Sequence, residues 1–178
     1  MIITVSGQIG AGKSTLAKDL AEKFNLKYIS AGGIMREMAQ EHEMSIMEFS
    51  KFAELNSWID REIDEKQKKL AEESDNCIVE GRISAHFLQA DLKVFLIAPQ
   101  KIRAKRIMRR DNFSSMEKAI KAIEAREKSE RRRYQKIYGI DLDDLESYDL
   151  VLNTAKFTSQ QIEVIVAGVI ERVIMSKS

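Results

Sequence analysis

Short apolar runs alternate along the chain with longer segments in which apolar residues recur every three or four positions. Most of the runs are rich in Val, Ile, Leu and Phe, with little of the alternation that a half-exposed strand shows. Strands of this kind are covered on both faces, as in a parallel sheet with helices on either side. We therefore predict an α/β fold with strands at 2–6, 27–30, 77–81, 93–98 and 149–154.

The segments between the runs have the spacing of amphipathic helices. In the first of them, Leu16, Leu20 and Phe24 recur every four residues and form one apolar stripe. Pro99 follows the fourth run and suits the first position of a helix, where its missing N–H needs no partner. We predict helices at 13–24, 32–42, 45–55, 57–73, 114–137 and 158–175. Without repeats or low-complexity linkers, the 178 residues predict a single domain over 1–178.

Composition narrows the class of protein. An apolar fraction of 44% and a charged fraction of 32% are typical of a folded, soluble chain. The single cysteine, Cys77, excludes an internal disulfide framework and a multi-cysteine zinc site. No apolar run approaches the length of a membrane span, and the first residues lack the pattern of a secretory leader. We expect a cytoplasmic protein with no membrane partner.

Charge is segregated although the net charge is only +1. Residues 101–136 hold 14 basic and 5 acidic side chains, so the rest of the chain is acidic. A solvated helical face would account for this, because Glu and Lys at four-residue spacing are ordinary surface pairs. The alternatives are a surface that binds nucleic acid and a set of arginines that bind the phosphates of small molecules.

Three of the eight glycines fall in one loop after the first predicted strand. The stretch from Gly7 to Ser14 matches G-x-x-x-x-G-K-[ST] and leads into a predicted helix. Glycines let backbone N–H groups approach an anion, and the start of the helix adds its positive dipole. We expect a nucleoside triphosphate to bind here, with Lys13 on its terminal phosphates and the Ser14 hydroxyl on Mg²⁺. The expected binding residues are Gly7, Gln8, Ile9, Gly10, Ala11, Gly12, Lys13, Ser14 and Thr15.

Other motifs exclude several classes that share such a loop. The string N-K-x-D that reads guanine in regulatory GTPases does not occur. The third strand ends in Glu80-Gly81-Arg82 rather than in the Asp or Asp-Glu of helicases and transporter ATPases. A small kinase remains, and it needs a site for an acceptor.

Four arginines are candidates for that acceptor site. Arg36 and Arg82 follow the second and third strands, whose carboxyl ends lie at the edge where ligands bind in open α/β sheets. Arg126 and Arg133 are seven residues apart and share one helix face. A planar guanidinium suits a monophosphate better than the point charge of lysine does.

These stretches together resemble the cytidylate kinases of the compact archaeal type, within the nucleoside monophosphate kinases. The resemblance runs along nearly the whole chain and is most specific in VEGR, in SAG with the following Arg, and in the run from Tyr134 to Asp149. It implies a P-loop kinase fold of three layers, with a five-stranded parallel sheet, an acceptor-binding insert near 32–73 and an arginine-rich lid near 110–133. Compact archaeal members often carry Thr where this chain has Lys13 and Ser14.

The resemblance also implies an activity and a set of roles. The reaction would transfer the γ-phosphoryl group of ATP to CMP or dCMP, in a monomer that binds no nucleic acid. Catalytic roles would fall to Lys13, Arg126 and Arg133, and Arg106, Arg109 and Arg110 would close over ATP. The acceptor would be bound by Ser30, Gly32, Arg36, Asp64, Arg82, Arg126 and Arg133.

Two points stay open at the level of sequence. Asp60 and Asp64 share a helix face and could read the cytosine amino group or the ribose, or be solvated helix charges. Glu80 could hold Mg²⁺ through water or take part in a buried ion pair near Arg82. The alternative functions are a kinase for UMP, AMP or a small acceptor such as shikimate, and an RNA-binding protein that uses the basic segment 101–136.

Overall fold

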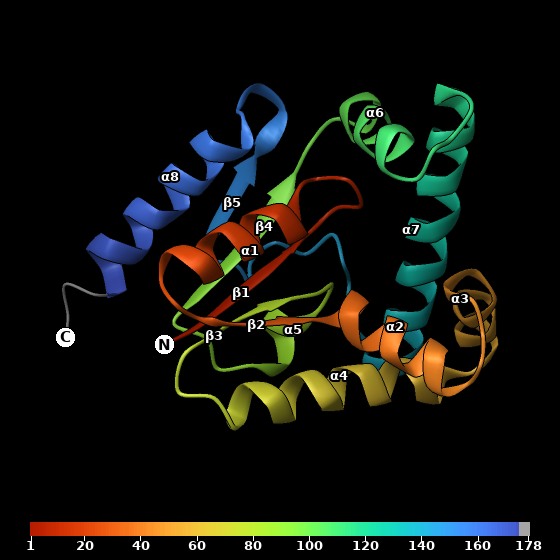
Figure 1. The fold of residues 1–178 in the computed structure, drawn as a ribbon, viewed down its shortest axis with the longest axis horizontal. Coiled ribbons are helices and arrows are strands. Elements are labelled where there is room, and N and C mark those ends of the chain that lie inside the picture. Colours follow the sequence, from red (N-terminus) through yellow and green to blue (C-terminus); the bar gives the residue numbers. More distant parts are fainter. Residues whose placement is uncertain (175–178) are drawn as a thin grey trace.

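The computed structural model describes residues 1–174, and within them five parallel strands form one sheet in the order β2-β3-β1-β4-β5 (Figure 1). The strands are β1 (Ile2–Gly7), β2 (Lys27–Ser30), β3 (Cys77–Glu80), β4 (Leu92–Ile97) and β5 (Leu150–Asn153). The predicted α/β class and all five strands are confirmed, with ends that differ by one residue at most. The first strand therefore lies in the middle of the sheet, so its carboxyl end opens onto the centre of the edge where ligands bind.

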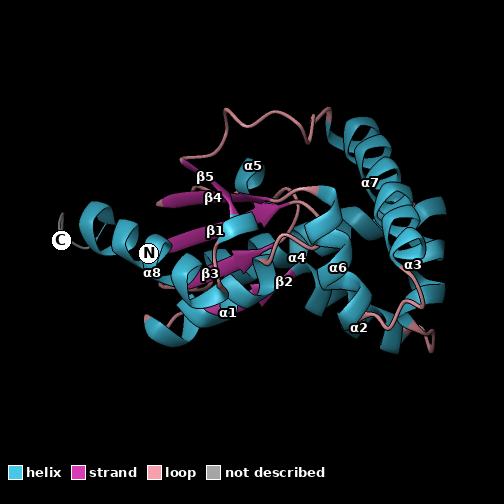
Figure 2. Ribbon diagram, turned by 90° about the horizontal axis from the view of Figure 1, so that it is seen from above, coloured by secondary structure: helices cyan, strands magenta, loops and turns pink. Residues whose placement is uncertain are grey.

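Helices cover both faces of the sheet and give three layers (Figure 2). They are α1 (Lys13–Lys23), α2 (Ala31–Glu41), α3 (Ile46–Leu55), α4 (Ser57–Glu72), α5 (Ser84–Phe87), α6 (Gln100–Arg110), α7 (Met116–Tyr138) and α8 (Ser159–Val169). A short 3₁₀ turn, Thr154–Lys156, precedes α8, and a π turn, Ile170–Ile174, follows it. None of the helices in this part of the chain is long and apolar enough to span a membrane.

The helices agree with the sequence pattern except in three places. The predicted last helix, 158–175, is observed to Ile174, and its residue 175 lies outside the described part. Pro99 occupies the position before α6 rather than the first helical residue, with an extended ψ of 140°. The four-residue α5 was not predicted, because one turn is too short to show a helical period.

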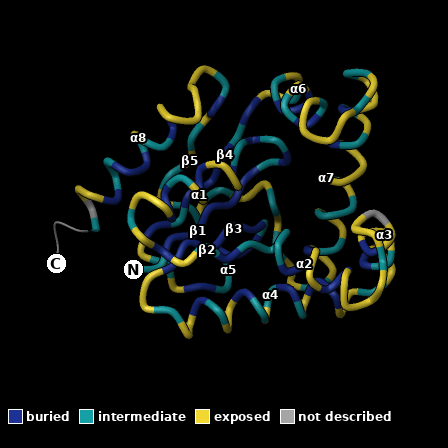
Figure 3. Tube along the Cα trace, in the orientation of Figure 1, coloured by how far each residue is buried: buried dark blue, intermediate teal, exposed yellow. Residues whose placement is uncertain are grey.

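The buried side chains alternate along the strands between two cores. On β3, Ile78 packs into the core beneath α1 and α8, whereas Cys77 and Val79 pack into the core beneath α2, α3 and α4. Figure 3 shows the buried positions gathered along the central strands. A third, smaller core lies where α6 meets α7, and Ile9 from the glycine loop inserts into it beside Ile123. The loop is thereby packed against both the sheet and the α6–α7 pair.

Candidate active site

The glycine loop leaves β1 and crosses the carboxyl edge of the sheet before α1 begins. Three of its residues have positive φ: Gly7 at +141°, Gly10 at +78° and Gly12 at +103°. A Cβ at Gly7 would lie 2.3 Å from the carbonyl oxygen of Leu96, so no side chain fits between the loop and β4. Gly12 precedes α1 without a side-chain cap, which leaves the first N–H groups of that helix open to an anion.

Cationic side chains from outside and inside the loop bind its carbonyl oxygens. The donors are Lys13 within the loop and arginines from the end of β3 and from α6. The bonds are Arg82 Nη1 to Gly7 O (2.8 Å), Lys13 Nζ to Gln8 O (3.0 Å), Arg103 Nη1 to Ile9 O (3.1 Å), and Arg106 Nη1 to Gly10 O and Ala11 O (3.4 and 3.3 Å). These bonds fix the orientation of the loop's carbonyl oxygens.

A cavity of about 540 Å³ lies on the α1 side of the loop. Its lining includes Gly10–Gly12 of the loop, Lys13–Leu16 in the first turn of α1, and Phe157, Ser159 and Ile162 around the start of α8. The other lining residues are Ile107 and two of the three arginines expected to close over ATP, Arg106 and Arg110. The third, Arg109, is exposed and does not line this cavity, so its role stays a prediction.

Lys13 is only 8% exposed, and burial together with the nearby Arg82 guanidinium holds its pKa well below the ordinary lysine value. The arrival of phosphate charge would favour its ammonium form. The hydroxyl-bearing Ser14 beside it is exposed to the cavity. Within residues 1–174, no group of three or more His, Cys, Asp and Glu side chains is placed to hold a metal ion.

Two of the four arginines expected at the acceptor site meet at one carboxylate. Glu130 of α7 has its Oε2 2.8 Å from Arg82 Nε and its Oε1 4.0 Å from Arg126 Nη2. Sequence reasoning missed Glu130, although it lies on the helix face shared by Arg126 and Arg133. Arg36 is not brought into this cluster: it is exposed on α2, and its Nη1 lies near Gly32.

Arg133 instead pairs with Asp60 of α4, at 3.2 Å between Nη1 and Oδ2. Asp60 is 6% exposed, and burial raises its pKa against the opposing effect of Arg133. Among the described residues, neither Asp60 Oδ2 nor Arg133 Nε has a hydrogen-bond partner. Asp60 Oδ2 is thus held only by its ion pair with Arg133, so this buried carboxylate and the Nε donor beside it can still accept and donate hydrogen bonds to a ligand.

The next acidic residue of α4 joins that helix to the end of α7. Asp64 Oδ2 accepts a hydrogen bond of 2.8 Å from the Tyr138 hydroxyl. Burial raises the pKa of Asp64 to about 7, with the Asp60 charge adding to the rise and the Tyr138 hydrogen bond opposing it. Gln67 lies one turn later on α4 and has a structural role. Its amide donates a hydrogen bond of 2.9 Å to the Glu80 carbonyl and so supports the end of β3.

Glu80 does not pair with Arg82. Its Oε2 accepts hydrogen bonds from the hydroxyls of Ser30 (2.8 Å) and Tyr28 (3.3 Å), which ties the ends of β2 and β3 together. The Ser30 hydroxyl also accepts from the Gly33 N–H at 3.3 Å and so caps α2. The SAGG turn thus begins the helix that carries Arg36.

Two curated proteins are similar to this chain in sequence over most of its length. A cytidylate kinase of Methanothermobacter thermautotrophicus is 49% identical over 160 residues, covering 90% of this chain and 99% of the relative. A cytidylate kinase of Pyrococcus horikoshii is 44% identical over 172 residues, covering 96% of this chain and 88% of the relative.

Solved structures resemble the chain in fold. An uncharacterised protein from Eubacterium ventriosum has a TM-score of 0.72 at 18% identity, covering 97% of this chain and 99% of the other. A shikimate kinase from Acinetobacter baumannii, solved in complex with shikimate, has a TM-score of 0.63 at 17% identity, covering 96% and 92%. The three-layer P-loop kinase fold is confirmed. A model of the cytidylate kinase-like family matches residues 2–156, and together with the relatives it shows that the chain belongs to that family.

Proposed function

We propose that this chain transfers the γ-phosphoryl group of ATP to CMP or dCMP and releases ADP with CDP or dCDP. The single observation that carries the choice of acceptor is the buried Asp60–Arg133 ion pair: among the described residues Arg133 Nε has no hydrogen-bond partner, and Asp60 Oδ2 is held by the ion pair alone. Cytosine presents an amino donor beside a ring-nitrogen acceptor, which complements a carboxylate beside a guanidinium. A uracil held in the same position would turn its O4 carbonyl toward the carboxylate and its N3–H toward the guanidinium, so these contacts would disfavour it.

The donor and the acceptor would occupy opposite sides of Lys13. The triphosphate would lie in the 540 Å³ cavity along Gly10–Thr15, with Arg106 and Arg110 beside it and its base toward Phe157. The acceptor would lie along α7, with its base at Arg133 and its phosphate at Arg82 and Arg126. Support comes from the buried position of Lys13: its Nζ bonds the Gln8 carbonyl, and Arg82 bonds the carbonyl of the adjacent Gly7.

The residues supply positioning and positive charge rather than a strong base. The acceptor is a phosphate oxygen, which is already largely anionic at pH 7 because its second pKa is about 6. Lys13 would neutralise charge on the transferring group, and Arg82 and Arg126 would hold the attacking phosphate against repulsion from the donor. Closure of the two phosphate sites would exclude water and limit hydrolysis of ATP.

Mg²⁺ is the cofactor that we propose, held by the Ser14 hydroxyl and the donor phosphates. Mg²⁺ is commonly bound through one or two protein oxygens with substrate phosphates and water, so the exposed Ser14 hydroxyl beside the loop fits it. When bound, the ion would offset the negative charge of the phosphates. Residues 32–73 would serve as the acceptor-binding insert and 110–133 as the lid. We further propose a cytoplasmic monomer that acts without nucleic acid.

The test is release of ADP with Mg²⁺ and a panel of acceptors: CMP, dCMP, UMP, AMP, GMP and shikimate. We expect CMP and dCMP to stimulate release far above the control without acceptor, and UMP to do so much less. ADP release that CMP and dCMP leave at the control level would overturn the proposal. A preference for UMP, AMP or shikimate would keep the phosphoryl transfer and replace the acceptor.

A further inference from the structure

Arg103, near the start of α6, connects three parts of the molecule while being only 5% exposed. Its Nε donates to the carbonyl of Ala98 at 2.8 Å, and its Nη1 donates to the carbonyl of Ile9 at 3.1 Å. The same Nη1 lies 2.7 Å from Glu127 Oε1 on α7. One buried guanidinium therefore joins the end of β4, the phosphate-binding loop and the long helix.

A second bridge of the same kind lies beside it. Arg82 donates to the Gly7 carbonyl at 2.8 Å and pairs with Glu130 at 2.8 Å. The two carboxylates are three residues apart on α7, and the two carbonyls are two residues apart on the loop. Helix and loop are thus joined twice in parallel, each time by carboxylate, guanidinium and carbonyl.

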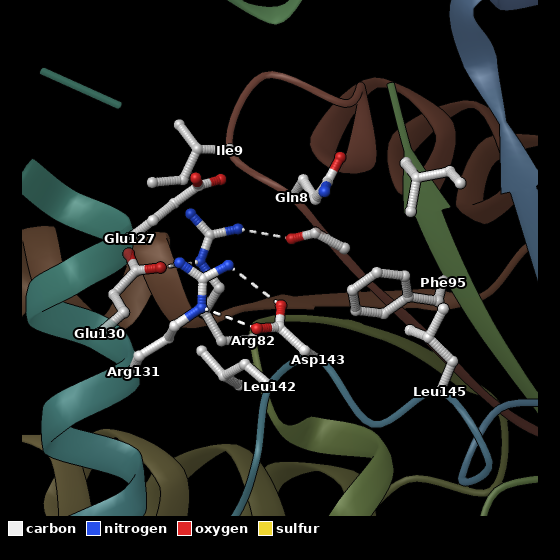
Figure 4. A pocket seen from close by; sticks show the side chains of 12 residues that line it. Gln8, Ile9, Arg82, Phe95, Glu127, Glu130, Arg131, Leu142, Asp143 and Leu145 are labelled. Carbon is white, nitrogen blue, oxygen red and sulfur yellow. Dashed lines mark hydrogen bonds and ion pairs between the residues drawn. The ribbon is translucent and has the colours of Figure 1, made fainter. Parts of the chain in front are cut away.

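The space between the loop and this part of α7 is not filled by side chains. A cavity of about 100 Å³ lies there, lined by Gly7, Gln8 and Ile9 on one side and by Glu127 and Glu130 on the other. Figure 4 shows both glutamates reaching from α7 toward the loop across this space, and Arg131 paired with Asp143 at its border. At this cavity the two bridges connect helix and loop, next to the apolar contact of Ile9 with Ile123.

From this geometry we infer that Arg103 and Glu127 are positioning residues that couple the phosphate-binding loop to the acceptor-binding face of α7. Both are argued to act through the loop and α7 rather than by contact with a substrate. Glu127 holds Arg103, and Arg103 holds the Ile9 carbonyl, which keeps the loop N–H groups directed at the donor. Since Arg126 and Arg133 are on the same helix, seating the acceptor fixes α7 and through it the loop. The inference rests on the proposed function, with ATP at the loop and CMP at α7.

The chain offers a matched control one turn earlier on α7. Glu124 accepts a hydrogen bond of 2.9 Å from the Gln100 amide, so it also joins α6 to α7. That contact is exposed and does not reach the loop. Glu127→Gln and Glu124→Gln therefore make the same chemical change at two α6–α7 contacts, only one of which continues to the loop.

The first readout is the affinity for CMP with and without a nonhydrolysable ATP analogue. For the wild type we expect the analogue to tighten CMP binding at least ~5-fold, the lower range of usual coupling between sites. In Glu127→Gln this factor should fall toward one, so that CMP binding no longer tightens with the analogue and the KM for CMP at saturating ATP rises by about the lost factor, and kcat should fall ~10-fold or more. Glu124→Gln should keep both wild-type values. Equal behaviour of the two variants, or a wild type without coupling, would overturn the inference.

The second readout does not depend on the acceptor. Hydrogen exchange of the loop amides in the protein without nucleotide should be several-fold faster in Glu127→Gln and in Arg103→Lys than in Glu124→Gln. Unchanged exchange in both loop-linked variants would refute the positioning role even if CMP were not the substrate. Absence of ADP release with CMP in the wild type would instead overturn the proposed function, so the two failures are distinguishable.

Discussion

Replacing Arg133 with methionine removes the cation from Asp60, a carboxylate that is only 6% exposed. Breaking a buried pair from one side costs about 3–5 kcal/mol, because the remaining charge is left without compensation. Burial already raises the pKa of Asp60, and Arg133 is the group that opposes the rise. In Arg133→Met the carboxyl therefore takes up a proton more readily when folded than when unfolded. The free energy of unfolding should fall as pH rises above the unfolded pKa of about 4.

Urea unfolding followed by circular dichroism at pH 5 and pH 8 measures this effect. We expect Arg133→Met to lose about 3–5 kcal/mol at pH 8 and clearly less at pH 5. Asp60→Asn combined with Arg133→Met should be more stable at pH 8 than Arg133→Met alone, because the buried charge is gone. A single variant within about 1 kcal/mol of wild type at both pH values would refute the reasoning, since that difference is too small for an uncompensated buried charge.

Four further predictions concern the glycine loop, the C-terminal cap of α7 at Gly139 and the α4–α7 contact. Lys13→Met should lower kcat at least ~10²-fold in the CMP assay, because the transferring group loses a positive charge. Thermal unfolding should stay near wild type, because burial already disfavours the charged form of Lys13. Near-wild-type turnover would remove Lys13 from its role. Gly7→Ala should lose more than about 3 kcal/mol in urea unfolding, from a backbone clash added to strain. Gly139→Ala, at φ +70° with open space around it, should lose only about 1–2 kcal/mol. Burial raises the pKa of folded Asp64 to about 7, so the Tm of the wild type should fall from pH 4 to pH 7. Asp64→Asn should show a smaller fall in Tm over this range. An equal fall in both proteins would contradict the raised pKa of Asp64.

Local patterns explain why the strands and the loop could be predicted from sequence. Strands buried on both faces appear in the sequence as continuous apolar runs, without alternating polar residues. The loop motif is contiguous, so Gly7–Thr15 could be identified without knowledge of the tertiary structure. The face shared by Arg126 and Arg133 follows from helical geometry alone and predicted that both belong to one side of α7.

Pairing between elements could not be predicted in the same way. Arg103 and Glu127 are 24 residues apart, and their contact depends on how α6 packs against α7. Glu130 lies on the predicted helix face, but only the fold brings Arg82 to it from the end of β3. Arg36 is exposed on α2, and its part in binding the acceptor stays a prediction.

Helix α7 is long enough for a small rotation at one end to move its other end by several ångströms. Its 23 residues span about 34 Å at 1.5 Å per residue. One end contacts α4 through Tyr138 and Asp64, and the other lies beside α6 at the opposite edge of the molecule (Figure 1). A rigid tilt of about 10° around the Tyr138 end would therefore move Met116 by about 6 Å. A displacement of less than 1 Å beside the Asp64 contact would thus be magnified severalfold at the far end, with no residue of the helix changing its conformation.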